Sequence, residues 1–434
     1  MRIPIRDTSK EDSYCVTADL LIPGRGEPFK NGCIIVSGTK ITHVGAVSEV
    51  LKYARLAALP KTHVEVLMPG MWDCHVHLMG IHKVSSAAIV ASASQQALAG
   101  ARSARDVMLL LDAGFTSVRE MAGYGIQLDQ AISEGSLVGP KIYSSNCIIS
   151  PTGGHADAHD MLADWFHDAV AHGLPCYTAD GVAECLKAVR TQLRAGASVI
   201  KICGSGGVGS ERDDPIDQQF SDEEIAAMVA EAARARRVVG AHCHGKPGIM
   251  ASLKAGVRTI EHGSYIDDEA ADLMLEKDAV LVATRLIVED GLKLGEGMFT
   301  PIGYQKLLVT AKAQWKAYQL AIKRGVKIAI GTDTGVSIPG GISQGRNGLE
   351  LGYAVKAGMT PLKAIESCCA NGPLTLGPMA PLSGQLKEGY DADFIALSKS
   401  PLDDIDVLAH AQNVTHVWRA GKCYKSPGHP VSCI

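Results

Sequence analysis

The fold is decided by one short segment, Met71-Trp72-Asp73-Cys74-His75-Val76-His77. It follows the apolar run 64–68 and the turn Pro69-Gly70, so we expect it to form the end of a β-strand. Alternate residues of a strand point to the same face, which places His75 and His77 side by side. Two imidazoles in this arrangement can bind one metal ion, although a single His-x-His pair is a weak signal.

The same kind of strand end recurs along the chain, each time with a side chain that can bind metal. Short apolar runs lead to Lys201, His242, His262 and Asp333. Imidazole and carboxylate are good ligands for Zn²⁺. With His75 and His77 this makes four histidines, one lysine and one aspartate at predicted strand ends, and the set predicts a metal centre.

Between residues 64 and 377 predicted strands and helices alternate, which favours a (β/α)8 TIM barrel of the α/β class. In such a barrel the active site lies at the C-terminal ends of the strands, where the six ligand candidates fall. A doubly wound open sheet is the alternative, but it would not bring together the ends of strands spread along the whole order. The predicted strands span residues 64–68 (continuing toward His77), 116–121, 141–149, 199–203, 238–242, 259–262, 280–285 and 326–331.

Both ends of the chain have a different character from the middle. Residues 13–60 and 393–424 consist of short β-type runs separated by turns, without the intervening helices. We therefore expect one small β-sandwich domain assembled from both termini. The predicted division is 1–68 for the first part of the sandwich, 69–378 for the barrel and 379–434 for the second part.

The composition, 46% hydrophobic and 20% charged residues with a net charge of −4, is typical of a soluble globular protein. There is no basic block, so neither nucleic acid nor a membrane is an expected partner. Residues 1–12 lack the apolar core of a signal peptide and no long apolar run follows, so a cytoplasmic location is expected. Twelve scattered cysteines favour reduced thiols, and Cys74 and Cys243 should face away from the metals because they alternate with histidines.

Lys201 needs a chemical explanation, because a protonated amine does not bind metal. Buried beside two dications, an ammonium group would be repelled and desolvated. Its neutral amine can instead take up carbon dioxide, and the resulting carbamate has two oxygens that can bridge two metals. A salt bridge on the barrel rim is the alternative role for Lys201.

The longest irregular stretch of the predicted barrel is 150–176, which we expect to form a wall or lid of the site. A surface insertion is the alternative. The stretch contains His155 and His159. Neither ends a strand, so substrate contact or a structural role is expected for both.

The ligand set His75-x-His77, Lys201, His242, His262 and Asp333 resembles that of the metal-dependent amidohydrolase superfamily. More narrowly, the chain resembles the ochratoxinase and prolidase-like (Xaa-Pro dipeptidase-like) subgroup. This narrower likeness lies in residues 68–75, 180–182, 241–251, 331–334, 370–378 and 401–405. Residues 384–393 are similar to the superfamily's closing segment. The resemblance covers nearly the whole chain.

The resemblance implies two Zn²⁺ per chain, one bound by His75, His77 and Asp333 and the other by His242 and His262. N6-carboxylysine at Lys201 and a hydroxide would bridge them. Asp333 would be catalytic, taking a proton from the nucleophile and giving it to the departing amine. His244 would also be catalytic, donating a hydrogen bond to the substrate carbonyl or oxyanion, unless it only supports a neighbouring ligand.

The resemblance further implies a carboxypeptidase-like amidohydrolase that cleaves N-acyl amino acids or dipeptides, including ochratoxin A, which would give ochratoxin alpha and phenylalanine. Such substrates carry a free carboxylate, which requires a cation or several donors. Arg285, at the end of the predicted seventh strand, is the main candidate, with a rim salt bridge or a packed side-chain stem as its alternative role. Tyr143 and His155 are weaker candidates. A homo-oligomer is expected.

Two other functions stay open. Similar barrels hydrolyse cyclic amides, as imidazolonepropionase and dihydropyrimidinase do, and a relative without metals could serve as an assembly scaffold. The complete ligand set argues against the scaffold. A deaminase is not expected, because His242 is followed by Cys243-His-Gly-Lys without the acid that such enzymes carry there.

Overall fold

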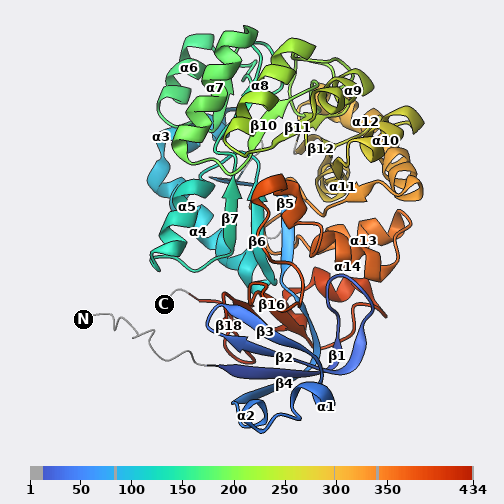
Figure 1. Ribbon diagram of the computed structural model, residues 1–434. Coiled ribbons are helices and arrows are strands. Elements are labelled where there is room, and N and C mark those ends of the chain that lie inside the picture. Colours follow the sequence, from blue (N-terminus) through green and yellow to red (C-terminus); the bar gives the residue numbers. More distant parts are fainter. Residues whose placement is uncertain (1–12, 83–85, 298, 339–341, 433–434) are drawn as a thin grey trace.

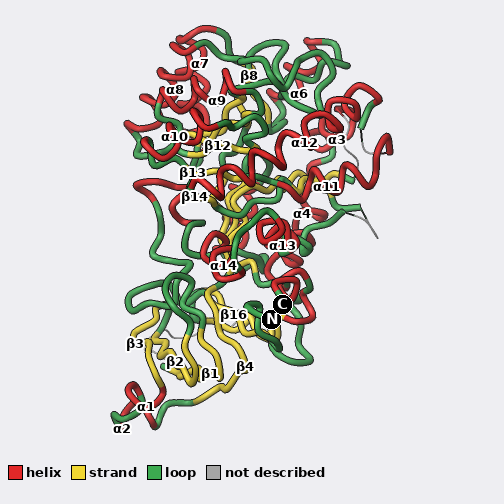
Figure 2. Tube along the Cα trace, turned by 90° about the vertical axis from the view of Figure 1, so that its right-hand side faces the viewer, coloured by secondary structure: helices red, strands yellow, loops and turns green. Residues whose placement is uncertain are grey.

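The computed structural model describes residues 13–82, 86–297, 299–338 and 342–432. Figure 1 shows two parts, an upper one in which helices surround strands and a lower one made of strands from both ends of the chain. In Figure 2 the strands of the upper part run through its middle and helices lie outside them.

The upper part is built around parallel strands. Hydrogen bonds group them into a four-stranded sheet, β15-β5-β6-β7, and a seven-stranded sheet, β14-β13-β12-β11-β10-β8-β9. Their bounds are β5 (Met71–Ile81), β6 (Phe115–Glu120), β7 (Lys141–Ser144), β8 (Ile148–Ser150), β9 (Cys176–Thr178), β10 (Ile200–Cys203), β11 (Val239–Cys243), β12 (Thr259–His262), β13 (Val280–Val282), β14 (Lys327–Ile328) and β15 (Thr334–Val336).

The two sheets join at both edges and close into a barrel. At one seam the Ser198 N–H donates to the Ser144 carbonyl, and at the other the Cys74 N–H donates to the Ile330 carbonyl, both at 2.8 Å. The predicted third strand is divided into β7 and β8, the eighth shortens to β14, and β15 and β9 lie outside the predicted strands. The predicted run 64–68 belongs to β4 (Lys61–Pro69) of the lower part, so the first barrel strand is β5. The closed ring confirms the (β/α)8 barrel, and the open doubly wound sheet is wrong.

Helices follow most of the barrel strands, and local sequence explains where several begin and end. Helix α8 begins with a capping box, in which the Ser221 hydroxyl accepts from the Glu224 N–H and the Glu224 carboxylate accepts from the Ser221 N–H. The barrel helices are α3 (Ser86–Ser94), α4 (Gln96–Asp112), α5 (Gly125–Ser133), α6 (Ala163–Ala171), α7 (Gly181–Ala195), α8 (Asp222–Arg234), α9 (Lys246–Ala255), α10 (Asp268–Glu276), α11 (Arg285–Leu294), α12 (Pro301–Arg324), α13 (Leu349–Lys356) and α14 (Pro361–Cys368).

The lower part is a seven-stranded sheet in the order β18-β17-β16-β4-β1-β2-β3. Antiparallel pairing of β16 with β4 joins the two ends of the chain, which confirms a separate sheet domain built from both termini. The sheet curls over its own core, because the Ile41 N–H donates to the Tyr390 carbonyl and the Ala392 N–H to the Thr39 carbonyl. Its strands are β1 (Tyr14–Leu21), β2 (Phe29–Ser37), β3 (Lys40–Ala46), β4 (Lys61–Pro69), β16 (Phe394–Leu397), β17 (Val414–Arg419) and β18 (Lys422–Lys425), with short helices α1 (Val47–Val50) and α2 (Ala54–Ala57).

The domain boundaries 1–68, 69–378 and 379–434 stay predictions. Among the helices of the described residues, none combines the length and the apolar run that crossing a bilayer needs.

Candidate metal centre

One group of predicted ligands comes from β5 and from the residue before β15. The Asp333 Oδ1 atom lies 3.0 Å from His77 Nε2 and 3.4 Å from His75 Nε2. The ligand atoms of these three side chains all lie within 4.8 Å of one another, close enough to share one ion. Lys201 on β10 points into the same place, with its Nζ atom 3.4 Å from His75 Nε2.

The second group comes from β11, β12 and the residue just after β11. The ligand nitrogens of His242, His244 and His262 lie within 4.8 Å of one another. The His262 ring is 4.6 Å from the His242 ring and 5.2 Å from the His75 ring, measured between centroids, so the two groups adjoin. The structure thus brings the six predicted ligands together and places His244 beside them.

In the first group the partners of Nδ1 leave Nε2 of both imidazoles facing Asp333 at the centre. His75 Nδ1 lies 2.8 Å from a Glu261 carboxylate oxygen, and His77 Nδ1 lies 2.9 Å from the Ala122 carbonyl. Both partners can only accept, so each Nδ1 carries the proton. Burial, together with Lys201, lowers the pKa of His75 to about 4, so this ring is neutral and its Nε2 has a free lone pair.

In the second group one partner fixes the tautomer and two do not. His242 Nε2 lies 3.2 Å from the Gly206 carbonyl, which leaves Nδ1 bare. His262 Nδ1 lies 2.7 Å from the Thr284 hydroxyl, and His244 Nδ1 lies 2.7 Å from the Ser264 hydroxyl. A hydroxyl can accept or donate, so both tautomers of His262 and His244 are satisfied.

A buried ion pair beneath the centre was missed by the sequence analysis. The Arg119 guanidinium, 0% exposed, donates to the two Glu261 carboxylate oxygens at 2.7 and 2.9 Å and to the Cys74 carbonyl at 2.6 Å. Burial would raise the pKa of Glu261, but Arg119 and the His75 hydrogen bond hold it well below its usual range. Glu261 is therefore a carboxylate that orients His75. The available signal was a charged residue inside each of two predicted barrel strands.

Electrostatics at the centre shift Lys201 toward its neutral form and keep Asp333 ionised. Burial lowers the pKa of Lys201, although Glu261 and Asp333 partly offset the effect. Burial would raise the pKa of Asp333, but His75, His77 and Lys201 hold it at about 2. A neutral amine can react with carbon dioxide, and an ionised carboxylate can bind metal or accept a proton.

The backbone is bent at the ligands. His262 has φ 69° and Asp333 has φ 59°, in the left-handed region that residues other than glycine rarely adopt. The Asp73 carboxylate supports the second bend by accepting from Thr332 N–H at 3.1 Å, from the Thr332 hydroxyl at 2.7 Å and from Asn347 Nδ2 at 2.7 Å. These bends turn both side chains toward the barrel axis at the strand ends.

The donor set fits a pair of divalent metal ions. Neutral imidazole nitrogens whose other nitrogen donates to a fixed acceptor are the usual zinc ligands in proteins. Cys74 and Cys243 face away, as predicted, because Cys74 Sγ lies 3.8 Å from the Gly372 carbonyl and Cys243 Sγ 3.5 Å from the Ser252 hydroxyl.

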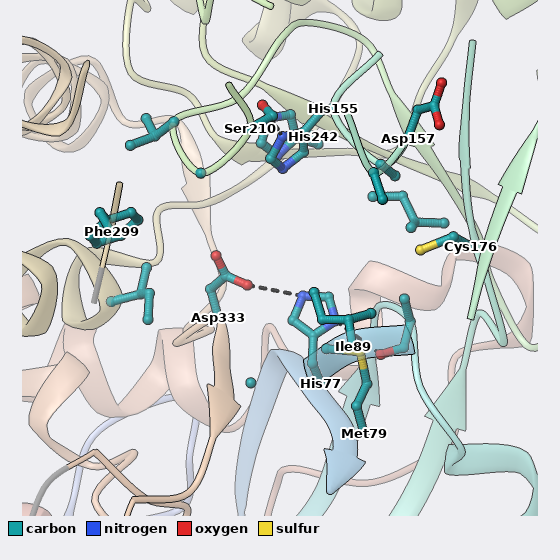
Figure 3. A pocket seen from close by; sticks show the side chains of 18 of the residues that line it. His77, Met79, Ile89, His155, Asp157, Cys176, Ser210, His242, Phe299 and Asp333 are labelled. Carbon is teal, nitrogen blue, oxygen red and sulfur yellow. Dashed lines mark hydrogen bonds and ion pairs between the residues drawn. The ribbon is translucent and has the colours of Figure 1, made fainter. Parts of the chain in front are cut away.

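A cavity of about 400 Å³ opens over the centre. Figure 3 shows His155 with His242 on one side, Asp333 with His77 on the other, and Phe299 and Cys176 at opposite ends. The lining is mostly apolar, and Lys201 is the only lysine or arginine among the described residues that line the cavity. Residues 155–160, 166 and 174–176 line it too, so the predicted segment 150–176 does form a wall.

Two histidines of this wall have different surroundings. His159 Nε2 lies 2.9 Å from the Gly154 carbonyl, which gives it a role within the loop. The His155 ring stacks on His242 at 4.2 Å, and its Nδ1 lies 2.9 Å from the Ser210 hydroxyl. Ser210 donates its own proton to the Asp213 carboxylate, so it must accept from His155 and leave His155 Nε2 bare.

The structure does not bring Arg285 and Tyr143 to the cavity. Strand β13 ends at Val282, and Arg285 is the first residue of α11, where its guanidinium donates to Glu289, the Ala311 carbonyl and Gln314. Tyr143 stacks on Trp72 with 5.2 Å between centroids. Neither side chain is among the lining residues, so the placement of both at the mouth was wrong.

Comparisons with known proteins agree with this architecture. Residues 66–423 match the family model described as the amidohydrolase family. The chain is 46% identical to ochratoxinase of Aspergillus niger over 98% of this chain and 89% of the relative. The crystal structure of A. niger ochratoxinase superposes with a TM-score of 0.88 at 44% identity, covering 96% of this chain and 97% of that one. A Xaa-Pro dipeptidase with bound methionine gives 0.83 at 29%, covering 95% of this chain and all of the other. This chain therefore belongs to the amidohydrolase family and is a hydrolase of amide bonds.

Proposed function

We propose that the chain is a binuclear zinc amidohydrolase that cleaves the amide bond of N-acyl amino acids or dipeptides, with ochratoxin A among its substrates. The observation that carries the proposal is the convergence of imidazole nitrogens, Asp333 and Lys201 under one cavity. His75, His77 and Asp333 would hold one ion, and His242 and His262 the other, with carboxylated Lys201 between them.

Two zinc ions at this place would lower the pKa of a shared water and polarise the scissile carbonyl. Asp333, ionised at neutral pH, accepts the proton of the attacking water and passes it to the departing amine nitrogen. His244, with Ser264 donating to its Nδ1, carries its proton on Nε2 and donates it to the substrate carbonyl oxygen.

His155 has a different role in this proposal. Its bare Nε2 accepts a hydrogen bond from the N–H of the scissile amide, because Ser210 and Asp213 keep the proton on Nδ1. The mostly apolar lining of the cavity, with Phe299 and Cys176 at opposite ends in Figure 3, would take apolar groups on either side of the amide.

Hydrolysis of a substrate panel by zinc-loaded protein tests the proposal. The panel contains N-acyl amino acids, dipeptides, ochratoxin A, the matching carboxamides without a free carboxylate, and cyclic imides. We expect turnover of the N-acyl amino acids. Turnover of cyclic imides alone would favour the cyclic-amide hydrolases, and two bound metals without any turnover would favour the scaffold. Homo-oligomeric assembly stays a prediction.

A further inference from the structure

The histidines of the second ligand group converge without any contribution from Lys201. The rings of His242 and His244 meet edge to face at 4.8 Å, and those of His244 and His262 lie 4.9 Å apart at an angle of 14°. All three side chains are buried, with 4%, 6% and 6% exposure. Three neutral imidazoles with an open fourth position are a complete protein ligand set for zinc.

Each ring of this three-histidine group has one nitrogen held by a partner and one nitrogen free. The partners are the Gly206 carbonyl for His242, the Thr284 hydroxyl for His262 and the Ser264 hydroxyl for His244. Such outer hydrogen bonds orient ligating imidazoles and fix which nitrogen is available. His244 therefore has the same kind of outer hydrogen bond as His242 and His262.

The backbone of His244 is also held in place. Its N–H donates to the Ser205 hydroxyl at 2.8 Å, and its carbonyl accepts from the Tyr265 N–H at 3.0 Å. With the backbone fixed, the contact between Nδ1 and the Ser264 hydroxyl holds the ring beside His262. A residue that only donates a hydrogen bond to substrate does not need to lie beside other imidazoles. The His244 ring does, because its ligand nitrogen lies within 4.8 Å of those of His242 and His262.

We infer that His242, His244 and His262 form a metal site that is complete without carboxylated Lys201, so that this site binds a divalent ion first and independently of carbon dioxide. The inference goes beyond the proposed function, although it concerns the same metal centre. Ser264 allows His244 to act either as a metal ligand or as a hydrogen-bond donor to substrate. When Ser264 accepts, His244 Nε2 is bare and binds metal, and when Ser264 donates, Nε2 carries the proton and faces substrate.

Metal binding to the full-length apoprotein tests this inference. Cobalt(II) is titrated in buffer freed of carbon dioxide, with bound metal counted after gel filtration and followed by its visible absorption. We expect the Lys201→Ala variant to bind one ion per chain. Adding His244→Ala in that background should weaken binding more than about 100-fold, beyond the 10–100-fold effect of losing an outer partner. Adding His77→Ala instead, which removes an imidazole of the other group, should leave the single ion bound.

Two outcomes would overturn the inference: no ion bound by Lys201→Ala, or equal affinity with and without His244→Ala. Thermal unfolding of the apoproteins shows whether each variant is folded. If the His244→Ala double variant is not, Ser264→Ala in the Lys201→Ala background decides, because it keeps the imidazole and removes its partner. Weakening of about 10–100-fold is expected there, and unchanged affinity would overturn the inference. Activity is not read, so a failure of the proposed function leaves this result intact.

Discussion

The His75 Nδ1 atom lies 2.8 Å from Glu261 Oε2, and the two side chains are 1% and 0% exposed. Glu261 accepts in turn from the fully buried Arg119 at 2.7 Å. His75, a proposed metal ligand, is thus oriented by an ion pair inside the barrel, beneath the cavity. This relationship links the stability of the barrel to the affinity of the site for metal.

We expect Glu261→Gln to weaken metal binding by about 10–100-fold, because the amide no longer fixes the His75 tautomer. It should also lower the free energy of unfolding by about 3–5 kcal/mol, since Arg119 keeps a buried charge without a partner. Competition with a chelator and denaturant titration measure the two effects. Glu269→Gln, which changes an exposed acid paired with Lys246, is the control and should alter neither. Unchanged metal affinity in Glu261→Gln would contradict the role of Glu261 in orienting His75 for metal binding.

We expect Asp213→Asn to reduce kcat/KM about tenfold for secondary amides and to leave N-methyl amides of the same acid nearly unchanged. The reason is that the Ser210 proton is freed from the carboxylate and donated to His155, which then no longer accepts at Nε2. Paired substrates measure the difference. Asp214→Asn, at the neighbouring exposed acid, is the control and should leave kcat/KM unchanged for both amides. An equal loss for both amides would exclude an N–H contact by His155.

We expect Arg285→Ala to lower the free energy of unfolding by about 2–3 kcal/mol, because two buried acceptors on α12 lose a charged donor. Michaelis constants for N-acyl amino acids and for the matching carboxamides should change by the same factor. Denaturant titration and the paired substrates measure this, with the exposed Arg55→Ala as control. A Michaelis constant that rises for the N-acyl amino acids but not for the carboxamides would show that Arg285 binds the substrate carboxylate.

We expect the stabilising effect of Glu350→Gln to appear only as the pH rises. Burial raises the pKa of Glu350 to about 8, from an ordinary value near 4.5 in the unfolded chain. Between these values the folded state holds a proton that the unfolded state has released, so the parent loses stability as the pH increases toward 8. Thermal unfolding should show the variant gaining on the parent from pH 5 to pH 9. A constant difference in Tm would contradict this.

The clustering of the strand-end side chains was predictable from sequence because residue type and position coincide there. An apolar run that ends in His242 or Asp333 shows both a barrel strand and the polar side chain at its mouth. Once the barrel closes, the ends of its strands meet, and the six side chains lie together. His244 was recognised as a site residue but not as a neighbour of His262, since that contact depends on the left-handed backbone at His262.

Other parts of the site depend on features that a linear pattern does not carry. Arg285 was misplaced because Thr284, with φ 55°, ends the extended backbone and starts α11. The pairing of Arg119 with Glu261 spans 142 residues and faces the barrel interior, where alternation alone does not distinguish a core position from an ion pair. His155 and Ser210 lie in two irregular loops. Loops have no periodic sequence pattern, so their contact could not be predicted.

The number of zinc ions per chain, measured for the parent and for Lys201→Ala after both are loaded in the presence of bicarbonate, tests the central claim most directly. We expect two ions in the parent, and at most one in the variant because the bridging group is lost. Two ions retained in Lys201→Ala would contradict a centre bridged by a carboxylated lysine.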